Sequence, residues 1–410
     1  MADQKRNVLI DKDLRPAYYD AFHCLAAGCR LSCCKGWRIS FDKKDYLSLK
    51  RQTGTDELDA RMKNGICRIR KGPLSDIHYG EFVMEGGVCP LLREDCLCAL
   101  QLEKGHEALP LVCRSFPRSE VYLISGYLER SLSPACEGVL ALLWDRPEGI
   151  DFLSDPLPKE KRRRGRFLKE NYLKPYFNEI RAQCIDLLQD RRYPLPHRIL
   201  LLGIALKELA DGETDIPKWL DRARALSEYP EAAEVFHESG QDKGLHMFLS
   251  NNIRLLSSLQ IQGQDFSTVH SDLVLGLGMQ VEKAASQATI FCAPYLNARQ
   301  RFKEHFADGG SFLENLMVSL FFHLHMPNLD GPEEAWKSYV NFCNLYSFYR
   351  FMAVMSCREG VEPSREELFR LMVFASRGLI HNSGQQTSLR DEFFQNDSAT
   401  LAHMAILLGG

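Results

Sequence analysis

The chain lacks long apolar runs, and this absence argues against a membrane protein. None of its 410 residues falls in an uninterrupted apolar stretch of the ~18 residues that a membrane-spanning helix needs. The N-terminal segment MADQKRNVLIDKDLR also lacks the apolar core of a secretory signal. Charge of either sign is not in excess, with a net charge of −3, so nothing in the composition calls for nucleic acid. We expect a cytoplasmic protein with no membrane and no nucleic-acid partner.

Two common binding signatures are also missing. Zinc ribbons use C-x2-C knuckles, whereas the close cysteine spacings here are C-x3-C, C-C and C-x-C. A Rossmann fold would show a glycine-rich turn between a strand and a helix. The nearest candidate, LGLGMQ at 275–280, has no strand pattern before it. The sequence therefore predicts neither a simple zinc ribbon nor a Rossmann nucleotide site.

Cysteine, by contrast, is concentrated near the N-terminus. Ten of the 14 cysteines lie in the first 136 residues. A chain of this length can bury a full core without disulfides, and a reducing compartment disfavours them. Soft thiolates suit zinc or an iron–sulfur cluster. With Cys67 and Cys96 set aside as additions, the candidate metal ligands are Cys24, Cys29, Cys33, Cys34, Cys89, Cys98, Cys113 and Cys136.

The adjacent pair Cys33-Cys34 bears on the type of centre. Eight thiols would fill two four-ligand sites, or one site with spares. In an extended backbone adjacent side chains point to opposite sides, so binding to different irons or different metals is easier than sharing one ion. We therefore favour an iron–sulfur centre, such as a 4Fe-4S cluster, over zinc. Disulfides and unligated structural cysteines are the remaining alternatives.

The chain changes character along its length. Residues 1–145 carry short apolar runs, frequent glycine and most of the cysteines, which indicates an irregular cysteine-rich metal or iron–sulfur module. Residues 146–166 are rich in proline and charge and end in the basic run KEKRRRGR, which indicates a linker. From 167 to 410 apolar residues recur at three- and four-residue spacing. We expect a mainly α protein, in which the cysteine-rich module precedes an α-helical domain.

Three motifs carry a resemblance to a known family: CCKGWRI (33–39), CPLLREDCLCALQLEKGHEALPLVCRSFPR (89–118) and LERSLSPAC (128–136). Together they resemble the flagellin lysine-N-methylase family, whose N-terminal part is similar to a broader family of zinc- or iron-chelating cysteine domains. Pro-Ala before Cys136 departs from the family pattern. The resemblance implies transfer of a methyl group from S-adenosylmethionine to lysine side chains of flagellin.

The resemblance directs attention to three further side chains. Trp37 offers an aromatic face for the sulfonium of S-adenosylmethionine. Arg114 and Arg118 would hold its carboxylate, or would form ion pairs within the module. Catalytic residues are not assigned. His323 and His325, two residues apart on an expected helix at 311–326, would point in different directions and read as ordinary core or surface histidines.

Two mechanisms and two rival functions stay open at this point. Direct SN2 transfer needs no iron, so the centre would organise structure or substrate. Radical chemistry typically uses C-x3-C-x2-C, which Cys29 and Cys33 begin but no cysteine at position 36 completes. The rival functions are a non-catalytic metal- or cluster-binding module and a methylase of another protein substrate.

Overall fold

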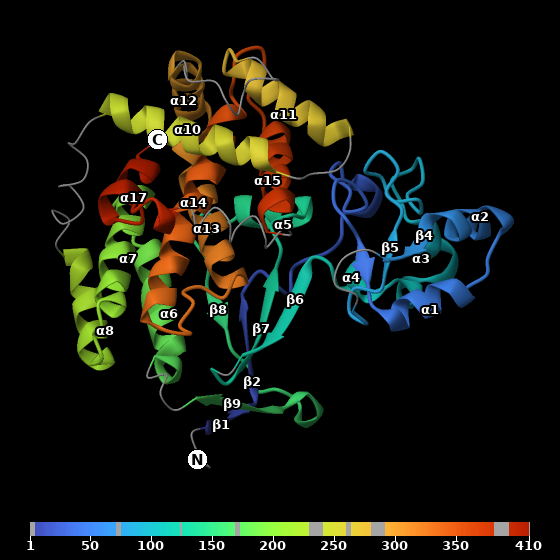
Figure 1. Cartoon of the computed structure of the whole chain (residues 1–410), viewed down its shortest axis with the longest axis horizontal. Coiled ribbons are helices and arrows are strands. Elements are labelled where there is room, and N and C mark those ends of the chain that lie inside the picture. The colour runs from blue at the N-terminus through green and yellow to red at the C-terminus, as the bar shows by residue number, and fades with distance from the viewer. Residues whose placement is uncertain are drawn as a thin grey trace.

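Helices form most of the folded chain. A computed structural model describes residues 5–70, 75–123, 125–168, 173–228, 241–259, 264–279, 292–380 and 393–409. Figure 1 shows a large helical body, a smaller lobe beside it and a sheet at their junction. The predicted mainly helical class is confirmed.

The sheet at the junction joins distant parts of the chain. Its strand order is β6 (Arg118–Tyr122), β7 (Tyr127–Leu132), β2 (Lys12–Pro16) and β8 (Phe152–Leu153). β7 runs antiparallel to β6 and parallel to β2, with Lys12 opposite Tyr127. A separate ribbon pairs β1 (Lys5–Ile10) antiparallel with β9 (Arg163–Leu168). The N-terminus is therefore paired with strands that follow the cysteine-rich region.

The smaller lobe is built from short elements around a small core. Its sheet has the order β3 (Ser40–Phe41), β5 (Gly80–Phe82), β4 (Ile66–Arg68). The helices around this sheet are α1 (Lys43–Arg51), α2 (Asp56–Gly65), α3 (Ala99–Lys104) and α4 (Leu111–Ser115). Thr55 caps α2 by accepting a hydrogen bond from the Leu58 amide. Phe41, Phe82 and Leu100 lie in the core, and Cys34, Cys98 and Cys113 pack against it.

The helical body surrounds one central helix, α14 (Pro332–Met355). Almost every side chain of α14 beyond its first turn is buried, so the helix has no solvent face. The helices around it are α5 (Glu137–Trp144), α6 (Phe177–Leu188), α7 (Leu195–Ala210), α8 (Ile216–Ala225), α10 (Gln241–Ser258), α11 (Gln264–Gly276), α12 (Cys292–Phe306), α13 (Gly310–His323), α15 (Arg365–Leu379) and α17 (Leu401–Leu408). The sequence Ser364-x-x-Glu367 predicts a helix cap, and α15 has it, since the Ser364 hydroxyl accepts a hydrogen bond from the Glu367 amide.

Two predicted helix limits are wrong. The helical spacing that the sequence shows from residue 167 onward predicts a helix that starts there. The helix α6 starts only at Phe177, because β9 continues to Leu168 and Pro175 lies in a short 3-10 turn before α6. The helix expected to reach 326 ends at His323, and His325 adopts a left-handed backbone with φ of 54°. Residues 146–166 contain β8 and the start of β9, and both strands pair with N-terminal strands.

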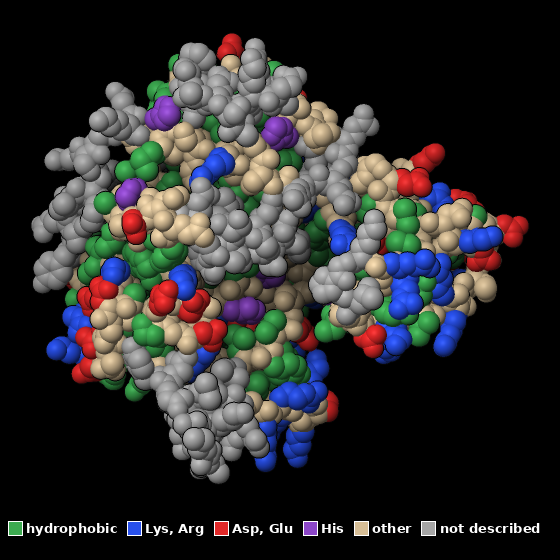
Figure 2. Space-filling view, in the orientation of Figure 1, with side chains coloured by type: hydrophobic (Ala, Val, Ile, Leu, Met, Phe, Trp, Pro, Cys, Tyr) green, Lys and Arg blue, Asp and Glu red, His purple; other side chains and the backbone are tan. Residues whose placement is uncertain are grey.

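The surface of the body carries a cluster of basic side chains. In Figure 2 lysine and arginine gather at the lower edge, over the segment that leads into β9 and contains KEKRRRGR. Within the described residues, no helix is long and apolar enough to cross a membrane.

Candidate functional site

Most of the predicted cysteine ligands lie around one cavity in the smaller lobe. The cavity has a volume of about 220 Å³ and is lined by Cys33, Cys34, Cys89, Cys98 and Cys113. The Cys34 thiol is hydrogen bonded to the thiols of both Cys33 and Cys89. Trp37 and Phe116 cover the same cavity, with their rings edge to face at 4.9 Å. Residues separated by up to 80 positions in sequence thus bring five soft donors together.

The other three predicted ligands, Cys24, Cys29 and Cys136, do not line this cavity. Cys136 interacts electrostatically with Cys33 and Cys24, and Cys29 interacts with Cys136. The Cys29 thiol also donates to Glu137 Oε2 at 3.4 Å. Five of the eight predicted cysteines therefore share one cavity, and the other three are linked to Cys33 or to one another by electrostatic interactions. Of the two cysteines set aside, Cys67 contacts Glu81 instead.

Local structure places two of these thiols at helix N-termini. Cys98 immediately precedes α3, and Cys136 immediately precedes α5. Burial raises the pKa of Cys136 to about 11, and the amides of Val139 and Gly138 partly oppose this rise. The amides of Leu100 and Gln101 act on Cys98 in the same way. Helix N-termini favour negative charge, so both positions suit a thiolate ligand.

The thiols do not stand in coordination geometry. Among the residues that the structure describes, no group of three or more His, Cys, Asp or Glu side chains is arranged to hold a metal ion. The cysteines are free thiols. The donor set nevertheless has the softness and number that a four-thiolate zinc or iron–sulfur centre requires.

The predicted cofactor-binding side chains already have partners within the protein. Arg114 donates to the Glu107 carboxylate at 3.1 Å. Arg118 donates to the Phe22 carbonyl at 2.9 Å and lies over the Phe22 ring. Trp37 donates from its indole to the Cys33 carbonyl at 2.7 Å, so its ring is held at the wall of the thiol cavity. Of the three, Trp37 is the one at the cavity.

One arginine of the helical body reaches the cysteine loops. Arg377 on α15 is buried and donates to the carbonyls of Lys35 at 2.9 Å and Leu31 at 2.7 Å. Its guanidinium lies 5.4 Å from the centre of the Trp37 ring. The last helices of the chain therefore help to hold the loop that carries Cys33 and Cys34.

A second cavity, of about 290 Å³, contains His325, one of the two histidines that the sequence indicated to be ordinary core or surface residues. His325 lines this cavity, and its Nδ1 is 3.0 Å from Oε2 of Glu129 on β7. Arg181 on α6 donates to both oxygens of the same carboxylate. Glu129 and Arg181 are fully or almost fully buried. A buried carboxylate between a histidine and an arginine is a typical arrangement of functional sites.

A sequence signal for this cluster exists but is weak. Glu129 lies in YLERSL, a short segment in which an acidic residue directly follows Tyr127 and Leu128. HLHMP places Pro327 just after the two histidines, which is typical of a helix end. Nothing in either segment indicates that the two meet, because 196 positions separate Glu129 from His325.

The sequence is similar to known proteins over parts of its length. The family model described as "FliB lysine N-methylase C-terminal domain" matches residues 181–407. The chain belongs to this family. The chain is also 34% identical over 140 residues to the lysine-N-methylase of Salmonella typhimurium, and 31% identical over 175 residues to the flagellar biosynthetic protein FliU of Salmonella muenchen. No solved structure matches.

The extent of each match differs. The alignment with the Salmonella typhimurium protein covers 33% of this chain and 33% of that relative, and the alignment with FliU covers 42% of this chain and 94% of FliU. The FliB family match begins at Arg181 and includes His325 and Arg377. It does not include Glu129 or the eight N-terminal cysteines. The histidine cavity therefore joins the FliB C-terminal domain to a strand that precedes it.

Proposed function

We propose that this chain is a protein lysine N-methyltransferase that transfers a methyl group from S-adenosylmethionine to flagellin. The observation that carries the proposal is the FliB lysine N-methylase domain match over residues 181–407. The names of two relatives, lysine-N-methylase and flagellar biosynthetic protein, support the reaction and the substrate respectively.

The chemistry sets two requirements for the site. Direct transfer needs a neutral lysine amine in line with the sulfonium methyl, at about 3 to 3.5 Å. A lysine side chain has an ordinary pKa near 10.4, so the protein must desolvate the amine or supply a base. Trp37 offers an aromatic face that suits a sulfonium, and it lies at the thiol cavity.

In this proposal the eight N-terminal cysteines bind an iron–sulfur centre, with zinc as the alternative. Cys34, Cys89, Cys98 and Cys113 would form one four-thiolate set at the cavity. Cys24, Cys29, Cys33 and Cys136 are the second set of neighbours. When bound, such a centre cross-links the loops of the smaller lobe. Free thiols at this density fit the reducing conditions of the cytoplasm, where we place the protein.

Incubation with S-adenosylmethionine and flagellin, followed by mass spectrometry, tests the reaction. We expect increments of about 14 Da on flagellin lysines, each corresponding to one methyl group replacing a proton. A folded, metal-loaded protein that adds no methyl group to flagellin would contradict the proposal and favour the non-catalytic cysteine module. Methylation of other proteins but not flagellin would contradict only the substrate.

Metal content is measured separately after anaerobic purification. We expect iron and sulfide together with absorbance in the visible range. A colourless protein that contains zinc would exclude the cluster without affecting the methyltransferase proposal.

A further inference from the structure

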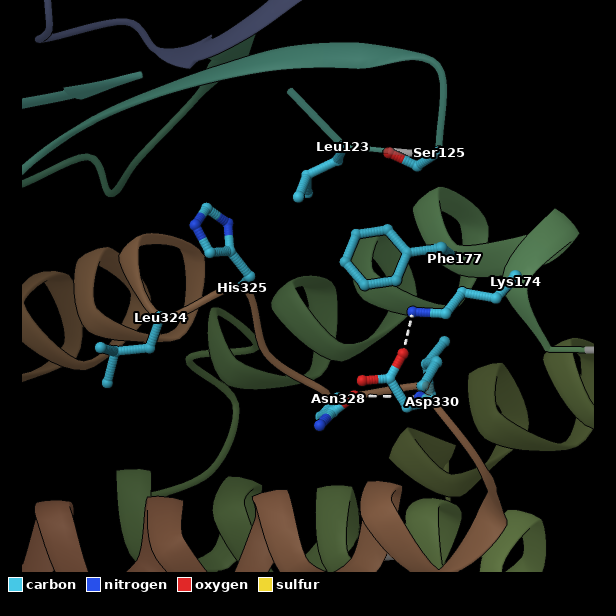
Figure 3. Close-up of a pocket in the computed structure, with 9 residues that line it drawn as sticks. Leu123, Ser125, Lys174, Phe177, Leu324, His325, Asn328 and Asp330 are labelled. Atoms are coloured by element: carbon cyan, nitrogen blue, oxygen red, sulfur yellow. Dashed lines mark hydrogen bonds and ion pairs between the residues drawn. The ribbon is translucent and has the colours of Figure 1, made fainter. Parts of the chain in front are cut away.

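The cavity at His325 is formed where three parts of the chain meet. Leu123 and Ser125 come from the turn between β6 and β7. Lys174 lies in the short 3-10 turn before α6, and Phe177 is the first residue of α6. The remaining lining residues come from the segment Leu324–Asp330 after α13. In Figure 3 the rings of His325 and Phe177 project into the same space. The ion pair between Lys174 Nζ and Asp330 Oδ1, at 2.6 Å, lies at its edge.

The position of the imidazole is fixed through Nδ1. Burial alone would raise the pKa of Glu129, but hydrogen bonds with His325 and Arg181 outweigh it, and the pKa lies below its ordinary value. Glu129 is therefore an ionised acceptor, and Nδ1 of His325 carries the proton of that hydrogen bond. In a neutral imidazole this leaves the lone pair on Nε2. Among the described residues, none is hydrogen bonded to Nε2.

Arg181 makes the carboxylate a rigid support. Its guanidinium is bidentate to Glu129 and lies 4.6 Å from the Phe177 ring centre and 4.8 Å from that of Phe322. Because Arg181 already balances the charge of Glu129, the carboxylate orients His325 without leaving an uncompensated buried charge. The left-handed backbone at His325 is a strained conformation for a non-glycine residue, and such strain is frequent at functional sites.

The lining suits the side chain of a lysine. Leu123, Phe177 and Leu324 provide apolar surface for an aliphatic stem, and His325 and Asn328 provide polar groups for an amine. Lys174 shows that a primary amine is already held at this cavity, by Asp330. A side chain of the same chemistry from another protein would therefore find both an apolar wall and an acceptor.

We propose that this cavity receives the substrate lysine and that His325 is the general base that deprotonates it. This inference rests on the proposed methyltransferase function. It also requires the sulfonium methyl of S-adenosylmethionine to lie at this cavity and not beside Trp37, because Trp37 lines the separate thiol cavity. Nε2 takes one proton from the ammonium group, and the freed amine lone pair attacks the methyl carbon of S-adenosylmethionine. A new N–C bond forms as the C–S bond breaks, and its electron pair stays on sulfur, which leaves S-adenosylhomocysteine and a protonated methyllysine. The imidazolium then returns its proton to water.

Several charged or titratable groups lie around His325 on the surrounding elements. These are Glu129 on β7, Arg181 on α6, His323 at the end of α13, Lys174 before α6 and Asp330 in the following loop. His323 differs from His325 in its surroundings. It is hydrogen bonded to Ser131 at 2.8 Å, does not line the cavity and stays neutral at pH 7 because burial lowers its pKa to about 4.

The test replaces His325 by glycine in the full chain and measures methylation of flagellin across pH. His325→Gly removes the imidazole and suits the left-handed backbone. We expect kcat to fall by roughly 10²–10⁴-fold, the usual contribution of a general base. Added imidazole should restore part of kcat in proportion to its neutral form, which a purely structural role of His325 would not allow. His323→Gln is the matched control and should keep the pH profile of the unmodified protein.

The outcomes separate this inference from the proposed function. If the unmodified protein methylates flagellin and His325→Gly keeps its kcat and pH profile, the base assignment fails alone. If His325→Gly is folded and inactive but gains nothing from imidazole at any pH, the base assignment also fails. If the unmodified, metal-loaded protein transfers no methyl group, the proposed function fails and the base assignment fails with it.

Discussion

The helical body and the smaller lobe bury their apolar side chains in different ways. In the body, α14 runs through the centre, and its side chains Tyr339, Phe348 and Met352 are almost completely buried. In the lobe, β3 has two residues and α4 has five, and half-buried thiols pack against the core. The body therefore has the larger core, and we expect the lobe, whose core is smaller, to depend more on whatever links its cysteines. Each prediction below tests this contrast.

The largest effect is expected from removing one thiol in each region. Cys34 bridges its neighbours at the thiol cavity, and Cys184 lies completely buried in the body. Cys34→Ala should abolish metal binding and amide-exchange protection across the lobe. Cys184→Ala should leave both intact and cost about 1 kcal/mol for a small cavity. Metal analysis and hydrogen exchange followed by mass spectrometry measure the two effects.

Retention of metal and of lobe protection in Cys34→Ala would show that the lobe does not depend on this thiol. Loss of lobe protection in Cys184→Ala would show instead that the two cores fold as one unit. Either result would remove the contrast.

The second prediction concerns the contact between the two regions. Arg377→Met removes the donors to the carbonyls of Leu31 and Lys35. We expect the free energy of unfolding to fall by about 2–3 kcal/mol, because two partly buried carbonyls lose a charged, buried donor. Limited proteolysis should cut the 24–37 loop faster, while the helices of the body stay protected. Arg365→Met is the control, since Arg365 on the same helix is half exposed and 3.9 Å from its partner Asp145.

The control should change stability by about 0.5 kcal/mol or less. Equal proteolysis of the loop in the Arg377 and Arg365 variants would mean that α15 does not hold the cysteine loop. The two regions would then be independent of each other at this contact.

The third prediction is a pH dependence of the body. Burial lowers the pKa of His323 to about 4, against an ordinary value of 6.5. The unfolded chain therefore binds this proton at a higher pH than the folded one, and stability falls as the pH drops from 6.5 to 4. The loss at pH 4 is roughly 2–3 kcal/mol. Urea unfolding of the unmodified protein and of His323→Gln at several pH values measures it.

The variant should lose less stability than the unmodified protein over this pH range. If the free energy of unfolding changes with pH by the same amount in the two proteins, His323 is not buried as a neutral ring. Because His323 contacts Ser131 on β7, the same comparison reports on the junction between the body and the sheet.

The sequence predicted local features well and long-range contacts poorly. The helical periodicity that gave α7 and α15, and the cap at Ser364, depend on residues a few positions apart. β9 was missed because its partner is at the N-terminus, where Lys5 faces Leu168. The pairing of Glu129 with His325 was missed for the same reason.

The cysteines were predicted together because soft-ligand chemistry gives distant thiols a reason to meet. The structure places five of them, Cys33, Cys34, Cys89, Cys98 and Cys113, at one cavity. It does not arrange them around a metal within the described residues, so their role as ligands stays a prediction.

The smallest effect comes from a matched pair of helix caps. Thr55 caps α2 in the lobe and Ser364 caps α15 in the body, each through a hydrogen bond of 3.2 Å from a backbone amide. Replacing either cap residue by alanine should lower the free energy of unfolding of its region by about 1 kcal/mol. If the lobe unfolds separately, Thr55→Ala should lower exchange protection only in the lobe, and Ser364→Ala should lower the free energy of unfolding of the body. If either variant lowers exchange protection in both the lobe and the body, the two regions unfold together, even though their cores differ.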